Sequence, residues 1–326
     1  GWDLSIPSIT VDTKFGVPVY DANKETETYL FNGEELLLKN GSSLYLSHRE
    51  ANAISRISNA TFYPKVEGSF SKIQRLGTNP SNYSWVVYDK SGMKYYYGTT
   101  NDSKITTDDG KINKWMLKKV EDKDGNYISY HYFDKYYYNG NLSNGKELCL
   151  DYIVYNLHDD LDNDLDKYVH LVSFKYKEES RPDTFITYRN GFKEVSASYI
   201  DRIKALSISK YDLFQIQLID RKVGLNLDIF NFEDIGEHIV EYQFNYQIGQ
   251  FNKLLLKSIN TINKKVIDYS ESLYEEESYS HEFDYYNDIE NGLFLNGHSI
   301  YSPKDLDVSL LEIDLPLTNL DLSMLS

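Results

Sequence analysis

One pattern appears twice in this sequence: an apolar strand, a charged turn of the form Asp-Lys-x-Gly, and a tyrosine-rich strand. The first copy spans 85–98 with its turn at 89–92, and the second spans 115–133 with its turn at 122–125. Glycine supplies the positive φ that a tight hairpin turn requires, and aspartate bonds the backbone N–H groups of the turn. The pattern predicts successive β-hairpins, which can lengthen a sheet without helices.

The composition agrees with a large β-structure. The chain has 326 residues, of which 41% are hydrophobic, so it can bury a sizeable core in one large β domain or in two smaller lobes. It contains 30 tyrosines, and tyrosine suits a half-buried strand because its ring packs while its hydroxyl stays hydrated. With only 7 prolines and 18 glycines, the chain is neither collagen-like nor a linker.

Charge and cysteine content exclude several classes of protein. The formal net charge is −16, whereas a free nucleic-acid binder needs a basic surface, so we expect no nucleic-acid partner. No apolar stretch approaches the ~20 residues of a membrane-spanning helix, and we expect no direct membrane insertion. The single cysteine, Cys149, excludes an internal disulfide, and its apolar surroundings predict a small core residue. Because the sequence starts at Gly1 rather than methionine, we expect a piece of a longer polypeptide.

Strand signals dominate the rest of the chain. In 239–247, Val240, Tyr242, Phe244 and Tyr246 alternate and are predicted to share one face. A short helix is predicted at 49–57, and a possible lobe boundary near 135–150, where turn residues accumulate. Besides the two hairpins, strands are predicted at 16–21, 28–38, 40–46, 148–155, 169–178, 184–200 (a hairpin turning at Asn190-Gly191), 202–211, 213–220, 224–232, 239–247, 254–270 and 278–287.

The sequence predicts no catalytic, cofactor-binding or metal-binding residue. No Gly-x-Ser-x-Gly motif accompanies the seven scattered histidines, and those in aromatic strand-like stretches, such as His131, are predicted to be structural. The histidines are His48, His131, His158, His170, His238, His281 and His298.

Two acidic motifs need separate treatment. Asp160, Asp162 and Asp164 alternate as in a calcium loop, but Leu165 and Leu171 stand where an EF-hand requires Gly and Glu, so a solvated loop is predicted. Glu275 and Glu277 form the Glu-x-Glu pattern that ADP-ribosyltransferases use. The upstream Arg and the Ser-Thr-Ser strand of those enzymes cannot be placed in this sequence.

An ordered set of segments resembles a known family. The segments are GWDLSIPSITVDTKFGVPVYD (1–21), FNGEELLL (31–38), FYPKVEGSFSKIQRLG (62–77), the two tyrosine-rich hairpins, ESRPDTFITYRNGFKEV (179–195) and YQFNYQIGQFNKLLLKSI (242–259). They resemble, in order, the SpvB-like domain that begins the B components of bacterial insecticidal toxin complexes and the virulence proteins of the SpvB type. The resemblance covers most of 1–290.

The resemblance implies an all-β fold of twisted antiparallel sheets built from successive hairpins, as part of an Rhs-like β-shell. It implies an SpvB-like domain over 1–298 and leaves the role of the leucine- and aspartate-rich tail, 299–326, uncertain. The implied function is a non-enzymatic structural domain of a secreted bacterial toxin-complex subunit, whose hollow shell encapsulates a toxic effector before translocation. The implied partners are an Rhs-type C component and a pore-forming A component. No cofactor is implied.

Two other functions stay open at this stage. A carbohydrate- or surface-binding β module would use exposed tryptophans, Trp85 and Trp115, with tyrosines as a sugar platform, although core packing is the alternative role of these rings. An enzyme, such as a glycosidase or an ADP-ribosyltransferase, would need two carboxylates placed in one cleft, and the sequence singles out no such pair.

Overall fold

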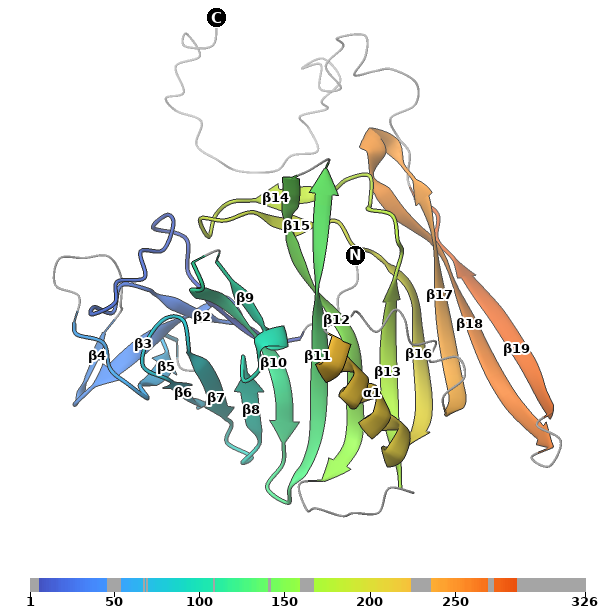
Figure 1. Cartoon of the computed structure of the whole chain (residues 1–326), viewed down its shortest axis with the longest axis horizontal. Coiled ribbons are helices and arrows are strands. Elements are labelled where there is room, and N and C mark those ends of the chain that lie inside the picture. Colours follow the sequence, from blue (N-terminus) through green and yellow to red (C-terminus); the bar gives the residue numbers. More distant parts are fainter. Residues whose placement is uncertain are drawn as a thin grey trace, which may run out of the picture. The chain divides into compact units, whose positions relative to one another are not determined.

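A computed structural model gives the fold of the chain (Figure 1). By its internal contacts the chain forms two compact units, Gly1–Phe283 and Asp284–Ser326. All the elements below belong to the first unit. The structure describes residues 6–45, 54–66, 68, 70–107, 109–139, 142–158, 167–223, 236–268 and 273–285.

The described residues are almost entirely β-structure, as the sequence predicted. The strands are β1 (Ser8–Val11), β2 (Tyr29–Phe31), β3 (Glu34–Asn40), β4 (Ser43–Tyr45), β5 (Thr61–Pro64), β6 (Lys72–Leu76), β7 (Ser84–Tyr88), β8 (Lys94–Tyr97), β9 (Lys104–Thr106), β10 (Ile112–Glu121), β11 (Asn126–Asn139), β12 (Leu142–His158), β13 (Tyr168–Tyr176), β14 (Phe185–Thr187), β15 (Glu194–Ser196), β16 (Ile200–Ser209), β17 (Glu237–Ile248), β18 (Leu254–Asp268) and β19 (Leu273–Glu282). The helices are α1 (Lys210–Val223) and the short 3₁₀ turns η1 (Asn101–Ser103) and η4 (Gln250–Asn252).

The first strands form a closed ring of antiparallel pairs. The pairing runs β1–β2–β3–β5–β6–β7–β8–β10 and returns to β1, because Ile9 of β1 lies opposite both Phe31 of β2 and Trp115 of β10. β4 adds to β3, and β9 adds to β10. β10 is long enough for its first half to close the ring and its second half to start another sheet.

Aromatic side chains fill this ring. The ring centres of Trp85 and Trp115 lie 5.6 Å apart, and Tyr29 and Phe62 lie 4.9 and 5.1 Å from Trp85. The indole Nε1 of Trp115 donates a 2.7 Å hydrogen bond to the Tyr83 carbonyl, so the polar atom of this buried ring is satisfied. The two tryptophans of the repeated hairpins are therefore the centre of the first core.

A second sheet continues from β10 as an antiparallel meander. Its order is β10–β11–β12–β13–β16–β17–β18–β19, which occupies the right half of Figure 1. The β14–β15 hairpin joins β12 through one parallel pair, Lys146 with Glu194. Within the described residues each edge of the meander strands from β11 to β18 has a neighbour, whereas β19 pairs with β18 alone.

Helix α1 covers one face of the meander, in front of β12 and β13 in Figure 1. Its Leu213 and Ile216 are buried with strand residues in the second core. The sequence prediction of a strand at 213–220 is therefore wrong. Ser209 caps the helix, since its Oγ accepts the Asp212 N–H at 3.1 Å and donates to the Asp212 carboxylate at 2.7 Å. The strand residues of this core are Tyr152, Val154, Leu157, Val169, Leu171, Leu206 and Ile208.

Both repeated hairpins are confirmed, with matching turns. Asp89 Oδ1 accepts the N–H groups of Ser91 and Met93 at 2.8 and 3.0 Å. In the second copy, Asp122 Oδ1 accepts the N–H groups two and four residues later at 2.8 and 2.9 Å. The turn glycines, Gly92 and Gly125, have φ values of 88° and 86°. The turn chemistry predicted from sequence therefore sets both turns.

Most other predicted strands are confirmed, with shifted ends. The predictions at 148–155, 169–178, 202–211, 239–247 and 254–270 fall in β12, β13, β16, β17 and β18, and 40–46 contains β4. The 278–287 prediction overlaps β19, which begins earlier. The 28–38 prediction is split into β2 and β3 by a turn at Asn32 and Gly33, whose φ values are 50° and 84°. The Asn190-Gly191 hairpin is β14–β15, with a longer connection than two residues.

Two further predictions are wrong where the structure describes them. Residues 16–21 form a bend followed by irregular chain instead of a strand, because Pro18 has no N–H to pair and Tyr20 has a φ of 54°. In the predicted helix 49–57, Ser55 forms a β-bridge with Lys24, and 49–53 lie outside the described residues. The 224–232 strand and the 299–326 tail also lie outside them.

The predicted domain limits stay predictions. The described parts of β11 and β12 run through 135–150, the possible lobe boundary, where Lys135 lies opposite Glu147. The predicted limit at 298 lies outside the described residues.

Candidate functional site

The closed ring contains a buried ion pair. Arg75 donates through both terminal nitrogens to Glu25, with Nη1 2.9 Å from Oε2 and Nη2 2.6 Å from Oε1. Nη2 also donates to the Ile57 carbonyl at 2.9 Å, and the guanidinium lies 4.0 Å from the centre of the Tyr83 ring. A second arginine, Arg56, lies beside this pair. Its Nη2 donates to Oε1 of Glu27 at 2.9 Å. The two arginines and the two glutamates, Glu25 and Glu27, balance in charge inside the core.

The tryptophans do not form a binding platform. Trp85 and Trp115 are 0% and 1% exposed, so neither ring face can stack on a sugar. Their predicted alternative role, core packing, is confirmed, and the tryptophan platform is wrong.

His131 lies in a polar cluster that superficially resembles a nucleophile and its base. Its Nε2 lies 3.1 Å from Ser129 Oγ, and its Nδ1 lies 3.3 Å from Lys118 Nζ. Lys118 in turn pairs with Asp102 at 2.7 Å, and the imidazole stacks on Tyr152 at 4.2 Å between ring centres.

The proton arrangement of this cluster opposes catalysis. An ammonium group can only donate, so Lys118 requires Nδ1 of His131 to accept. The imidazole proton then resides on Nε2, which donates to Ser129 instead of taking its proton, as a general base would. Burial and the Lys118 charge also lower the pKa of His131 to about 3. His131 lies on strand β11, packed against Tyr152, where the sequence predicted a strand-face or core histidine.

The other sequence candidates do not converge. His158 Nε2 lies 2.9 Å from the Asp124 carbonyl oxygen, His170 contacts Tyr155, and His238 lies 3.6 Å from Glu241. Among the described residues, no three His, Cys, Asp or Glu side chains lie together as a metal site would require. The candidates His48, His298, Asp160, Asp162, Asp164 and Leu165 lie outside the described residues.

The remaining candidates lie on strands. Glu275 and Glu277 belong to β19, opposite Lys265 and Asn263. Leu171 is buried in the second core. Cys149 is buried as predicted, and burial raises the pKa of its thiol to about 12. In the part of the chain that the structure describes, no helix has the length and apolar character needed to cross a bilayer.

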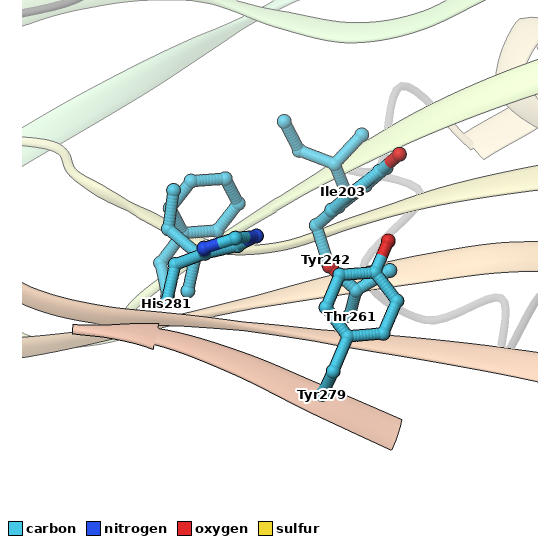
Figure 2. Close-up of a pocket in the computed structure, with 7 residues that line it drawn as sticks. Ile203, Tyr242, Thr261, Tyr279 and His281 are labelled. Atoms are coloured by element: carbon cyan, nitrogen blue, oxygen red, sulfur yellow. The ribbon is translucent and has the colours of Figure 1, made fainter. Parts of the chain in front are cut away.

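An open groove of about 340 Å³ lies on the sheet across β16–β19 (Figure 2). Two rows of paired residues form it, because successive strands place partners side by side on one face. The rows are Ile203, Tyr242, Thr261 and Tyr279, and Phe244, Ile259 and His281. Its lining contains no carboxylate, so the groove suits apolar contact better than acid–base chemistry.

The sequence analysis pointed to two of the seven residues that line this groove. The predicted period-two face of 239–247 includes Tyr242 and Phe244, which both line it. The sequence analysis missed Ile203, Tyr279 and His281. These residues meet because of the strand register across the sheet, which the sequence does not show. Phe244 is 4% exposed and Tyr279 52% exposed, so the groove opens towards β19.

Comparison with known proteins finds one family over the first part of the chain. The model of the SpvB family, described as "Salmonella virulence plasmid 65kDa B protein", matches residues 1–148. These residues form an SpvB-like region. This SpvB region holds the whole closed ring, β11 and the start of β12. No curated protein sequence matches the chain.

Solved structures extend the SpvB fold beyond the matched region. The N-terminal domain of the effector SpvB from Salmonella typhimurium is 16% identical, with a TM-score of 0.59, and the match covers 81% of this chain and 89% of that one. The TcdB2-TccC3 structure is 17% identical, with a TM-score of 0.58, covering 85% of this chain and 14% of that one. A Photorhabdus luminescens Tc holotoxin pore is 17% identical, with a TM-score of 0.55, covering 80% and 13%. These likenesses establish the fold of the SpvB region and of the meander.

Proposed function

We propose that this chain is a non-enzymatic structural domain of a bacterial toxin-complex subunit. In this proposal its sheets form part of a hollow β-shell that encapsulates a toxic effector before translocation. The observation that carries it is the meander from β10 to β19, an uninterrupted antiparallel wall attached to an SpvB-family ring. Its likeness to TcdB2-TccC3, of which it spans 14%, supports the same conclusion.

The proposed partners follow from the same likeness. They are an Rhs-type C component and a pore-forming A component, and the complex would act as a secreted toxin. The described polar clusters support a role without catalysis, since the Arg75–Glu25 pair is buried and His131 holds its proton towards Ser129. A saturable enzymatic activity that is lost on replacing one pair of carboxylates would contradict this part of the proposal.

A chimera tests encapsulation directly. This chain would replace the matching region of TcdB2 in a TcdB2-TccC3 complex, and the effector region would be probed by limited proteolysis. We expect the chimera to assemble and the effector to be protected as in the parent complex. A folded, assembled chimera whose effector is digested as fast as free effector would refute the proposal. A parent complex with the matching region deleted serves as the unprotected control.

A further inference from the structure

Among the described residues, the outer edge of β19 has no partner strand. The Phe283 N–H donates to the Lys257 carbonyl at 2.9 Å, so Phe283 forms a hydrogen-bonded pair across to β18. In antiparallel sheets, hydrogen-bonded pairs alternate with non-hydrogen-bonded pairs along each strand. Every second residue before Phe283, namely His281 and Tyr279, therefore also directs its backbone N–H and C=O to β18. Ser278, Ser280 and Glu282 then direct theirs outward. Among the described residues, no strand pairs with that edge.

The groove is incomplete on the same side. Tyr279 and His281 project from β19 into the groove, as Figure 2 shows. Both are exposed, while Phe244, two strands inward, is buried. A further strand beside β19 would place alternate side chains next to Tyr279 and His281. Apolar residues at those positions would bury surface that is now exposed to water.

The charge of this edge restricts the occupant. Residues 277–284 contain Glu277, Glu282 and Asp284 and no lysine or arginine, whereas Glu275 and Glu276 lie opposite Lys265 and Lys264 of β18. A second copy of β19 would bring the same carboxylates alongside and would be repelled. A strand that carries lysine or arginine complements this edge.

We propose that the outer edge of β19 binds an extended segment of a partner polypeptide in which apolar residues alternate with lysine or arginine. The apolar residues complete the groove over Tyr279 and His281, and backbone bonds form with Ser278 and Ser280. The inference rests on the proposed function only for the idea that a partner continues the sheet.

The test uses the full chain and a fluorescent peptide that alternates valine and lysine, with binding followed by anisotropy. Ser280→Pro removes one outward N–H while keeping the charge and the bonds to β18, and proline is tolerated on an edge. We expect about tenfold weaker binding than for the unmodified chain, from the lost bond and the steric effect of the ring. Ser280→Ala keeps its N–H and should bind as the unmodified chain does.

Two peptide controls separate pairing from simple attraction to an acidic protein. A peptide in which proline replaces valine keeps the charge but cannot form a strand, and it should not bind measurably. A valine–glutamate peptide should also fail to bind. Equal binding to Ser280→Pro and Ser280→Ala, or equal binding of the proline peptide, would overturn the inference. If the chimera protects its effector even with Ser280→Pro, this inference fails and the proposed function stands.

Discussion

Arg75 and Glu25 meet inside the closed ring through two hydrogen bonds of 2.9 and 2.6 Å, and both side chains are fully buried. Removing one partner leaves an uncompensated charge in the core. We expect Arg75→Met to lower the free energy of unfolding by about 3–5 kcal/mol, measured by urea denaturation. The pair Lys65–Glu35, 2.6 Å apart at the surface, provides the control.

Because Lys65 is half-exposed, Lys65→Met should change the unfolding free energy by less than about 1 kcal/mol. If Arg75→Met and Lys65→Met lowered the unfolding free energy by similar amounts, the structural role of the buried pair would be contradicted.

The stability of the chain should depend on His131 in mildly acidic solution. Burial lowers the pKa of His131 from 6.5 to about 3, so the folded state excludes a proton that the unfolded state binds. Stability is therefore complete above pH 6.5 and falls as the pH decreases towards 3, by at most about 1.4 kcal/mol per pH unit. His131→Gln, which cannot titrate, should show a weaker dependence between pH 6.5 and 4.5.

His281→Gln replaces an exposed imidazole on β19 in the same way and serves as the matched control substitution. If His131→Gln and the native chain follow the same pH profile, the buried neutral imidazole is disproved.

Gly98 should tolerate no side chain. Its φ is 60°, and a Cβ at this position would overlap the Trp115 ring. We expect Gly98→Ala to cost roughly 3 kcal/mol or more, from backbone strain and overpacking together. Gly92 has a φ of 88° with open space around it, so Gly92→Ala should cost only about 1–2 kcal/mol. Thermal denaturation of both variants measures these losses of stability. Equal decreases in melting temperature for Gly98→Ala and Gly92→Ala would mean that Gly98 is only a turn residue.

Cys149 should react only when the protein unfolds. Burial raises its pKa to about 12, so the reactive thiolate is scarce and inaccessible at neutral pH. Labelling with a thiol reagent should be slow in buffer and should accelerate through the urea transition monitored by tryptophan fluorescence. Stoichiometric labelling of the native protein within the mixing time would contradict the buried position.

Local chemistry explains which features could be predicted. The Asp-Lys-x-Gly turns specify the two early hairpins, because each aspartate bonds backbone groups within four residues. The helix α1 was missed because its apolar residues fit either a strand or a helix. The deciding feature is the N-cap Ser209, whose Oγ accepts the Asp212 N–H, and this bond is visible only in the structure.

Long-range pairing could not be read from sequence. Ring closure depends on Ile9 meeting Trp115, and the groove depends on Ile203, Tyr242 and Tyr279 aligning across four strands. Register of this kind is decided by tertiary packing and by bulges, such as the one between Asn245 and Tyr246. The alternating face predicted for 239–247 does contain the two β17 residues that line the groove, Tyr242 and Phe244.

Ring closure also gives the molecule a direction. Since β1 returns to β10, the N-terminal strands circle back on themselves, and the meander leaves from β10 towards β19 only. Among the described residues, the ring end of the meander is closed on itself, and β19 is the strand of the meander whose outer edge has no partner. We therefore expect a sheet that continues the meander to join it at β19.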